Sequence, residues 1–388
     1  MNFFLTEEQQ VLQQAVREFA REEIAPRSAE YNRRHEFPWE NFRRLAELGY
    51  LNMHLPEEYG GQGLDWVSYA IVIEELARAC AVTAVIYEVH CSLHSEAIYL
   101  FGTEEQRRRY LPRLSRGELL GAYALTEPQA GSDAAAIQTR AERVGDEYVL
   151  NGQKIFITNG GVADLYIVFA RTHPDPSLRH KGITAFIVEK GTPGLSFGPP
   201  ERKMGLHASH TTAVYLENVR VPVENRLGPE GEGFKIAMAI LDRGRIGIAA
   251  QAVGITQAAF DEAMKYATER HTFGKPIIEH QAIAFKLADM ATELEAARLL
   301  TYRAAFLMDQ GVPCTKEVAM AKLFASEVAM RQTVEAVQIL GGYGYMEEYR
   351  VERLMREAKI TQIYEGTSEI QRLVISRHLL KELQAARG

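Results

Sequence analysis

Apolar residues recur every three to four positions over about the first 120 residues, a spacing that predicts a series of amphipathic helices. Thr6 and Gln9 form a capping-box pattern ahead of the first apolar stripe. Pro26 is expected to end this helix, because proline has no amide hydrogen for the helical ladder. The members of the stripe are Val11, Leu12, Val16, Phe19 and Ala20.

Three further local signals fall in the same block. Thr103 and Gln106 repeat the capping-box pattern, and Asp65 is a suitable N-cap for another helix. Residues 55–63 contain three glycines and a proline, and we interpret them as a loop. The first block is therefore predicted to be helical throughout, with loops between its helices.

The pattern changes near Gly121, where runs rich in β-branched and aromatic residues begin. Residues 147–150 and 154–158 flank Asn151-Gly152, a dipeptide typical of two-residue hairpin turns because both residues tolerate positive φ. We therefore predict a hairpin there, and a small antiparallel barrel or sandwich for the block as a whole. Further strands are expected at residues 165–170, 183–189 and 212–216.

Helical periodicity returns from residue 231 in longer segments, which predict an antiparallel four-helix bundle. The expected helices are residues 233–269, 280–309, 316–340 and 367–384. The fold class is thus α+β and multidomain. We expect an N-terminal helical domain (1–121), a central β-domain (122–230) and a C-terminal bundle (231–388).

Composition narrows the function classes. The 388 residues are 46% hydrophobic and 24% charged, values typical of a globular protein. The formal charge of −7 offers no broad basic surface for nucleic acid or anionic lipid. The three cysteines, Cys80, Cys91 and Cys314, have no metal-binding spacing and suggest a reducing compartment. Without a signal-peptide pattern or an apolar run of about 18 residues, we expect a soluble intracellular protein and no membrane insertion.

Two loops carry candidate binding chemistry. Residues 124–133 contain helix breakers and the hydroxyls of Thr126 and Ser132, which suit a polar heterocycle or a phosphate. A plain polar linker explains this loop equally well by itself. Residues 338–345 hold three glycines in four positions between two helices, which allows either a cofactor contact or a tight interhelical turn.

Two more segments carry charge. Glu365 precedes a helix in which Ser368 and Gln371 can form a capping box, so its carboxylate is either a general base or a partner of the helix dipole. Residues 270–276 form a basic and aromatic loop. Arg270 can bind a pyrophosphate and Phe273 can cover an apolar ring, although a solvated interhelical loop is the simpler interpretation.

These four segments together resemble the signature segments of the acyl-CoA dehydrogenase family, and the resemblance extends over essentially the whole chain. The segments occur in the family's order: TEPQAGSD at 126–133, ERHTFGKPI at 269–277, QILGGYGY at 338–345 and YEGTSEIQR at 364–372. The resemblance implies a flavoprotein that uses FAD to introduce a trans-2,3 double bond into an acyl-CoA thioester. We expect a short- to medium-chain, straight-chain substrate.

The resemblance also implies residue roles. Glu365 matches the family's usual catalytic base, and its backbone N–H would bind the thioester carbonyl. In some branched-chain members the base comes from the position occupied here by Gly244, so this chain argues against an isovaleryl-type enzyme. Substrate contacts are implied for Ser132, Asp242, Arg245, Tyr364 and Gly366, and no metal site is expected.

The FAD contacts that the resemblance implies fall in three groups. The first group is Tyr123, Leu125, Thr126, Gly131, Ser132, Phe156, Ile157 and Thr158. The second, expected to hold the adenine and pyrophosphate partly across a subunit boundary, is Arg270, Thr272, Phe273, Gln281, Gln338, Gly341 and Gly342. The third is Thr367 and Glu369. Phe156 stands where the family often has tryptophan, and Gln129 where many members have glycine.

The resemblance further implies a homotetramer, with electron-transferring flavoprotein as the oxidant and fatty-acid β-oxidation as the setting. Such an enzyme would be cytoplasmic in a bacterium or, in a eukaryote, a mature mitochondrial matrix form. Two alternatives remain open: an acyl-CoA oxidase, and a catalytically silent flavin or acyl-CoA-binding protein of the same fold. The sequence does not fix acyl length, branching or pathway.

Overall fold

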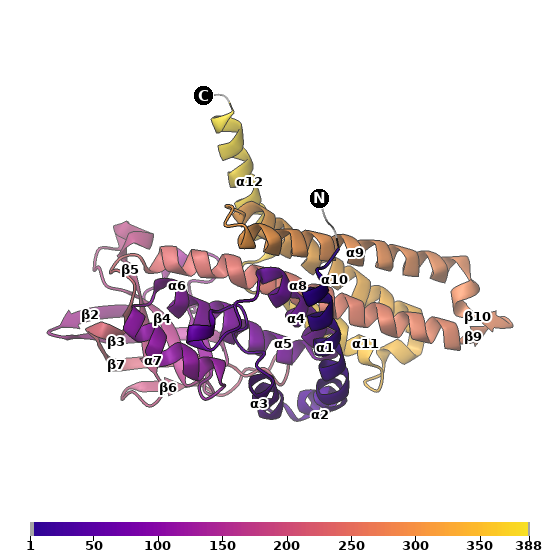
Figure 1. Cartoon of the computed structure of the whole chain (residues 1–388), viewed down its shortest axis with the longest axis horizontal. Helices are drawn as coiled ribbons and strands as arrows, with labels where there is room; N and C mark the ends of the chain where they lie inside the picture. Colours follow the sequence, from indigo (N-terminus) through magenta and orange to yellow (C-terminus); the bar gives the residue numbers. More distant parts are fainter. Residues whose placement is uncertain (1–3, 387–388) are drawn as a thin grey trace.

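The sheet lies at one end of the molecule, and long helices extend from beside it to the other end, with the shorter N-terminal helices packed alongside (Figure 1). The computed structural model describes residues 4–386. Residues 1–3 and 387–388, at the ends of the first and third predicted blocks, lie outside the described residues. Among residues 4–386 no helix combines the length and the apolar character that a membrane crossing requires.

The predicted N-terminal helices are present. Both capping boxes are confirmed: Thr6 accepts from the Gln9 amide at 3.2 Å, and Thr103 accepts from the Gln106 amide at the same distance. Asp65 caps its helix by accepting from Ser68 N at 2.7 Å. The helices are α1 (Glu7–Phe19), α2 (Ala25–Arg34), α3 (Trp39–Glu47), α4 (Trp66–Ala79), α5 (Ala81–Glu88), α6 (Glu96–Phe101) and α7 (Glu104–Ser115).

The expectation that Pro26 ends the first helix is wrong. A π-helical segment, η1 (Ala20–Ile24), follows α1 and leads directly into α2, in whose first turn Pro26 lies. A proline is tolerated in a first turn because its missing amide hydrogen has no intrahelical partner there. A second π-helical segment, η3 (Val89–Ser95), joins α5 to α6, and all its residues are buried.

The central block forms one eight-stranded mixed sheet in the order β6-β7-β3-β2-β4-β5-β8, with β1 on β4. β1 and β4 pair in parallel, and β2 and β4 also pair in parallel, at a single residue pair. The remaining strand pairs of this sheet are antiparallel. The strands are β1 (Gly121–Ala124), β2 (Arg140–Val144), β3 (Glu147–Thr158), β4 (Leu165–Arg171), β5 (Ile183–Glu189), β6 (Leu195–Phe197), β7 (Thr211–Pro222) and β8 (Arg226–Leu227).

The predicted hairpin at Asn151-Gly152 is wrong, because β3 runs straight through this dipeptide. The register against β7 shifts there, and Asn151 Oδ1 accepts from the Asn218 amide of β7 at 2.8 Å. Gly152 lies so close to Thr139 that a Cβ would be 2.4 Å from its Oγ1. The asparagine–glycine pair therefore serves a bulge and a close approach instead of a turn.

The C-terminal helices are α8 (Gly233–Glu269), α9 (Gln281–Asp309), α10 (Thr315–Leu340), α11 (Arg350–Ile360) and α12 (Ser368–Ala385). The first three pack on one another, and α11, which the sequence analysis missed, packs on α8 and α10. The predicted last helix is present, but α12 packs mainly on α10 and points away from the body of the molecule (Figure 1). Its N-cap is Thr367 and not Ser368: Thr367 Oγ1 accepts from Ile370 N at 3.3 Å.

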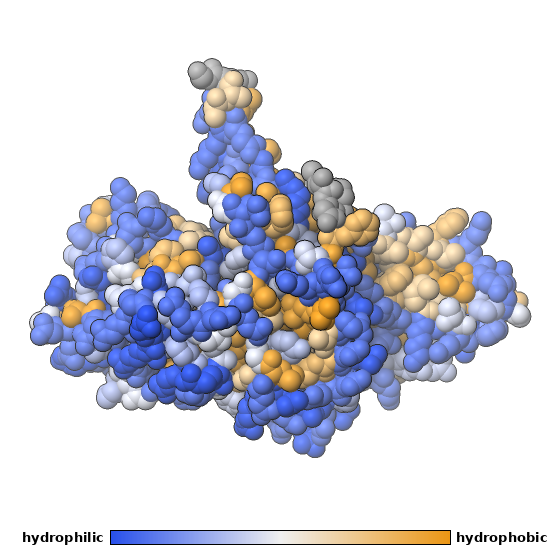
Figure 2. Space-filling view, in the orientation of Figure 1, coloured by the Kyte–Doolittle hydropathy of each residue, from blue (hydrophilic) through white to orange (hydrophobic). Residues whose placement is uncertain are grey.

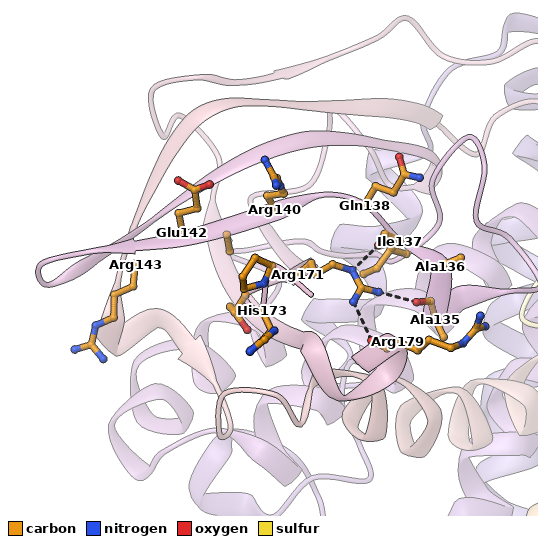
Figure 3. A pocket seen from close by; sticks show the side chains of 13 residues that line it. Ala135, Ala136, Ile137, Gln138, Arg140, Glu142, Arg143, Arg171, His173 and Arg179 are labelled. Carbon is orange, nitrogen blue, oxygen red and sulfur yellow. Dashed lines mark hydrogen bonds between the residues drawn. The ribbon is translucent and has the colours of Figure 1, made fainter. Parts of the chain in front are cut away.

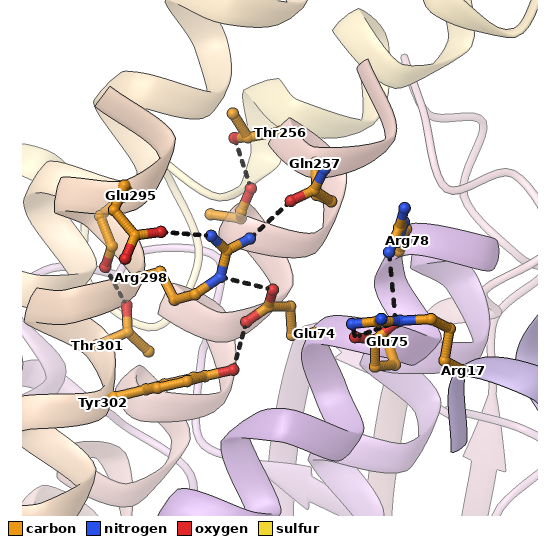
Figure 4. Close-up of polar contacts among 12 residues, drawn as sticks. Arg17, Glu74, Glu75, Arg78, Thr256, Gln257, Glu295, Arg298, Thr301 and Tyr302 are labelled. Carbon is orange, nitrogen blue, oxygen red and sulfur yellow. Dashed lines mark hydrogen bonds and ion pairs between the residues drawn. The ribbon is translucent and has the colours of Figure 1, made fainter. Parts of the chain in front are cut away.

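Buried ion pairs connect the N-terminal helices to the long helices (Figure 4). Glu74 of α4 accepts from Arg298 Nε at 2.9 Å and from the Tyr302 hydroxyl at 2.7 Å, both on α9. Arg298 also donates to Gln257 of α8 at 2.7 Å. Because Glu74 is 3% exposed, its charge depends on these donors for compensation. The network fixes α4 against both α8 and α9.

Replacing Arg298 with methionine should therefore destabilise the protein by about 3 kcal/mol, because the Glu74 carboxylate remains buried without a cation. The free energy of unfolding from urea denaturation measures the loss. Arg21→Met is the matched control, since Arg21 and its partner Glu22 are both mostly exposed, and its effect should stay below about 1 kcal/mol. Equal effects of the two substitutions would contradict a stabilising role for the network.

Candidate active site

A buried ion pair fixes the loop between β1 and β2. Lys154 of β3 is fully buried and donates through Nζ to Leu125 O at 3.0 Å and to Glu127 Oε1 at 2.7 Å. Glu127 also accepts the backbone amides of Gln138 and Thr139 at 2.5 and 3.0 Å. With one cation, two backbone amides and the Gln129 side-chain amide around it, the Glu127 carboxylate holds both ends of the loop against β3.

Polar groups and an aromatic ring gather beside this ion pair. Thr126 O accepts from Ile155 N at 2.9 Å, which places the start of the loop against β3. The next residue, Phe156, has a φ of 57° and is 63% exposed, at a shift in the β3–β7 register. Gly131 and Ser132 are exposed, whereas Leu125 and Ile157 are buried. Thr158 ends β3, half-buried.

Glu365 lies on the turn before α12, where its φ is 55°. Arg245 Nε donates to Glu365 O at 3.1 Å, and Gln371 Nε2 donates to the same oxygen at 3.3 Å. Lys322 Nζ donates to Gly366 O at 2.7 Å. Side chains from α8, α10 and α12 thus hold the backbone of this turn.

The Glu365 carboxyl lies against the backbone of α8. A Cβ at Gly244 would be 2.2 Å from Glu365 Oε2, so any side chain at that position would displace the carboxyl. Glu365 Oε2 is buried, and apart from the Glu88 carboxyl the structure identifies no hydrogen-bond partner for it within residues 4–386. The geometry gives a physical reason for glycine at position 244 when the glutamate is at 365.

Burial dominates the electrostatics of Glu365 and raises its pKa to about 7. A hydrogen bond with the Glu88 carboxyl and the charges of Lys322 and Arg245 oppose this rise. Arg245 is itself paired with Asp242 at 3.0 Å. A carboxyl group with a pKa near 7 in a dry site is suited to general-base chemistry at neutral pH.

Two predicted tyrosines lie at the same junction. The Tyr123 hydroxyl donates to Ala237 O of α8 at 3.3 Å, and the Tyr364 hydroxyl bonds Gln251 Oε1 of the same helix. Burial and the nearby Glu365 carboxyl raise the pKa of both phenols well above the usual value. Both phenols therefore remain neutral, and their rings lie close to Glu365.

The structure brings a second set of predicted residues together at the far end of the long helices. A cavity of about 610 Å³ is lined by Arg270, Thr272, Phe273, Gly341 and Gly342, among others. Thr272 Oγ1 and His280 Nε2 are 3.1 Å apart, and Phe273 is 97% exposed. Gln281 and Gln338 are exposed and do not line this cavity.

The remaining predicted residues lie on the first turn of α12. Thr367 is its N-cap and Glu369 is exposed in its first turn. Hydrogen bonds to its own backbone amide and to Thr367 lower the pKa of Glu369. Neither side chain reaches the Glu365 carboxyl by any contact that the structure records within residues 4–386.

The two predicted clusters are far apart within one chain. Gly244 of α8 lies beside Glu365, and Arg270 is the C-cap of the same helix. The 26 residues between these positions correspond to about 39 Å at 1.5 Å per residue. This distance exceeds the reach of one extended dinucleotide. The Glu365 cluster and the Arg270 cluster of a single chain therefore cannot hold the same cofactor molecule.

Another cavity, of about 880 Å³, lies between β2 and the segment after β4 (Figure 3). Its most polar lining residue, Arg171, donates to three backbone carbonyls at 2.8 to 3.0 Å, those of Ala135, Ile137 and Arg179. Arg179 is paired with Asp133 at 2.8 Å. None of the predicted site residues lines this cavity, although two other titratable residues, Glu142 and His173, do.

Residues that the sequence analysis missed complete the Glu365 site. They are Glu88, Lys322 and Gln371 around Glu365, and the Lys154–Glu127 pair behind the loop. Glu88 interrupts an apolar helical run from residue 81 to 89, a signal that could have indicated a buried carboxyl. Glu127 and Gln371 lie within the signature segments at 126–133 and 364–372, whereas Lys154 and Lys322 have no comparable signal in the sequence.

Comparison with known proteins covers all three blocks. The family model for the acyl-CoA dehydrogenase N-terminal domain matches residues 6–118. The models for the middle and C-terminal domains of that family match residues 122–219 and 231–380. The matched segments together span most of the chain.

Individual relatives agree with these matches. The short-chain specific acyl-CoA dehydrogenase of Clostridium acetobutylicum is 51% identical over 381 residues, covering 98% of this chain and 100% of the relative. The butyryl-CoA dehydrogenase of Megasphaera elsdenii superposes with a TM-score of 0.95 at 50% identity, covering 98% and 100% of the two chains. A structure from work on the electron transferring flavoprotein of Acidaminococcus fermentans and flavin-based electron bifurcation gives a TM-score of 0.96 at 52% identity, with the same coverage.

The buried pair behind the β1–β2 loop leads to a specific expectation. Lys154→Met should destabilise the protein by about 3 kcal/mol and increase hydrogen exchange of the loop amides, because Glu127 loses the buried cation that pairs with it. Adding Glu127→Gln should recover part of the lost stability, since no buried charge then remains unpaired. Lys235→Met, at an exposed ion pair, is the control. Unchanged loop exchange in Lys154→Met would show that the pair does not position the loop.

Proposed function

The chain belongs to the acyl-CoA dehydrogenase family, and we propose that Glu365 is the base that removes the α-proton of its acyl-CoA substrate. The observation that carries this proposal is the Glu365 carboxyl itself, with its buried Oε2 and a pKa near 7. Members of the family are flavoproteins, and FAD is the cofactor of this chain. The chain is an oxidoreductase, and dehydrogenation of acyl-CoA is its family's reaction.

The chemistry of the two clusters fits FAD. The loop fixed by Lys154 and Glu127 presents the Thr126 backbone beside the exposed ring of Phe156, as a surface for a flat heterocycle requires. At the other cluster, Arg270 and Thr272 offer a cation and a hydroxyl. No atom lies within 4 Å of a Cβ built at Gly341 or Gly342, which leaves room for a pyrophosphate. We propose the cofactor contacts named from the resemblance on this basis, with Gln281 and Gln338 at the rim.

The α-hydrogen of a thioester is only weakly acidic, so its removal needs a well-placed base and donors for the enolate oxygen. We assign the base to Glu365 and one donor to its backbone N–H. Burial of Oε2 limits the contact of the carboxylate with water, while Lys322 and Arg245 provide positive charge nearby that favours its ionisation near neutrality. When bound, FAD accepts the hydride equivalent that leaves the β-carbon.

Further residues are proposed to bind the substrate. Arg245 and Asp242 are paired on α8, and Arg245 also bonds the Glu365 turn that carries Tyr364 and Gly366, so these four residues would surround a thioester bound at Glu365. Ser132 lies on the exposed tip of the β1–β2 loop, where it can contact the CoA moiety.

We propose a short- to medium-chain, straight acyl group as the preferred substrate. Leu93 would lie 2.6 Å from a Cβ at Gly244, and the Tyr364–Gln251 bond closes the space along α8. Leu93 and Tyr364 therefore border the Glu365 carboxyl along this helix. The relatives named as short-chain or butyryl-CoA dehydrogenases support the same size.

We also propose a homotetramer in which the Arg270 cluster of one copy completes the cofactor site of another. The support is the distance of about 39 Å along α8, which one cofactor does not bridge. Blocks 1–121, 122–230 and 231–388 are proposed as its domains. Electron-transferring flavoprotein is the proposed oxidant, supported by the structural neighbour from that system. We place the reaction in fatty-acid β-oxidation, in the bacterial cytoplasm or the mitochondrial matrix.

Glu365→Gln tests the base directly. The variant should retain FAD but lose at least about 100-fold in the rate at which butyryl-CoA bleaches the flavin, because the amide cannot accept the proton. Anaerobic stopped-flow absorbance measures this rate. Glu382→Gln, an exposed glutamate on α12, is the matched control and should bleach normally. Rapid bleaching in Glu365→Gln would refute the assignment, and absence of bleaching in the wild type would favour a silent binding protein.

The pKa of Glu365 predicts the pH dependence. Only the carboxylate accepts a proton, so kcat/KM should rise about tenfold per pH unit below pH 7 and level off above it. Steady-state rates with butyryl-CoA between pH 5 and 8.5, at constant ionic strength, give the profile. An acid limb near pH 4.5, the ordinary range of glutamate, would show that Glu365 is not desolvated in the working enzyme.

A further inference from the structure

We propose that Glu88 is a positioning residue for the base: its protonated carboxyl donates a hydrogen bond to the Glu365 carboxylate in the substrate-free enzyme. This inference rests on the proposed role of Glu365. Glu88 is the last residue of α5, directly before the π-helical segment η3, and it is fully buried. No step of the proposed reaction uses it.

The two carboxyls lie along one glycine face of α8. A Cβ built at Gly244 would be 2.2 Å from Glu365 Oε2, and one built at Gly247 would be 2.6 Å from Glu88 Cγ. Residues three apart on a helix are neighbours on its surface, about 5 to 6 Å from one another. Because neither position has a side chain, both carboxyl groups can pack against α8. They therefore lie next to one another, although they come from distant parts of the chain.

The other hydrogen bonds around the two carboxyl groups leave Oε2 of Glu88 and Oε2 of Glu365 free to interact with one another. Ser92 Oγ donates to Glu88 Oε1 at 2.6 Å. Glu88 Oε2 and Glu365 Oε2 are both buried, and each lacks any other hydrogen-bond partner that the structure identifies within residues 4–386. The two carboxyl groups are within hydrogen-bonding reach of one another. Two carboxylates cannot bond, but a single proton between them satisfies both oxygens.

The surroundings decide which group keeps the proton. Glu365 faces the Arg245 guanidinium and the Lys322 amine, whose pKa burial lowers to about 7, whereas the groups around Glu88 are acidic or neutral. Charged and titratable groups around Glu365 are Lys322, Arg245, Tyr123, Tyr364 and Glu88. Those around Glu88 are Glu365, Tyr69, Tyr364 and Cys91. Burial and the Glu365 charge raise the pKa of Glu88 well above the ordinary value, so the proton stays on Glu88.

This arrangement gives Glu88 two effects on the base. The hydrogen bond holds the Glu365 carboxylate in one orientation against Gly244, ready for a substrate that arrives from the other side. It also stabilises the ionised form, since a donated hydrogen bond favours the charged state of an acid. Removing the donor should leave Glu365 protonated up to a higher pH.

A pair of substitutions separates the hydrogen bond from simple packing. Glu88→Leu removes the donor, whereas Glu88→Gln keeps an N–H donor and a carbonyl for Ser92. In Glu88→Leu the acid limb of kcat/KM should move up by about one pH unit, an approximately tenfold loss at pH 6 that disappears above pH 8. Glu88→Gln should keep the wild-type limb. Holoenzyme with bound FAD and butyryl-CoA are used throughout.

Glu96→Gln is the control for a buried glutamate of the same region, because Glu96 bonds His54 and Arg243 and does not face Glu365. Its acid limb should match the wild type. An unshifted limb in Glu88→Leu, or equal shifts in Glu88→Leu and Glu88→Gln, would overturn the proposal. These outcomes can be distinguished from a failure of the proposed role of Glu365, because in that case the flavin of Glu365→Gln would still bleach rapidly.

An infrared measurement covers the case in which Glu88→Leu does not fold. At pH 8 the wild-type holoenzyme should show a carbonyl stretch of a protonated carboxylic acid, which moves in D₂O and is missing from Glu88→Gln. Identical spectra for the two proteins in this region would show that Glu88 carries no proton, and would overturn the proposal without any kinetic assay.

Discussion

The structure around the candidate site follows from the burial of one carboxyl group. Taking a carboxylate out of water is unfavourable unless nearby groups compensate its charge. At Glu365 the compensation comes from three segments that are distant in the sequence: Arg245 on α8, Lys322 on α10 and Glu88 at the end of α5. Full compensation would return the pKa to its ordinary range and abolish its basicity near neutral pH. The site therefore depends on partial compensation, and helices α5, α8 and α10 must all be in place to achieve it.

The same logic of paired buried charges explains how the surrounding elements are held. Glu74 and Arg298 connect α4 to α9, while Glu127 and Lys154 connect the β1–β2 loop to β3. In each case breaking the pair leaves a charge in a dry environment, so the partners specify one relative placement of their elements. Two glycines of α8 also position acidic groups, because the lack of a side chain at Gly244 and Gly247 lets Glu365 and Glu88 contact the helix backbone. Charge and the lack of side chains together determine how closely these elements approach one another.

Local features were predictable from the sequence, and features made by contacts between distant segments were not. The capping boxes at Thr6 and Thr103 were predicted correctly because the bonds span three residues. The hairpin at Asn151-Gly152 was not, because Asn218 and Thr139, far away in the chain, turn the same dipeptide into a bulge. Glu365 was identified through the resemblance to a family and only weakly through its own surroundings. Its partner Glu88 could not be assigned, since only the fold places α5 beside the turn before α12.

Exchange of α-hydrogens tests the central claim most directly, because it isolates proton removal from hydride transfer. Acetyl-CoA has α-hydrogens but no β-carbon, so it cannot be dehydrogenated. In D₂O at pH 8, the wild-type holoenzyme should replace the acetyl hydrogens with deuterium, as followed by proton NMR, whereas Glu365→Gln should leave them in place. Equal exchange by the two proteins, at a rate above that of buffer alone, would show that a different group removes the proton and would contradict the account.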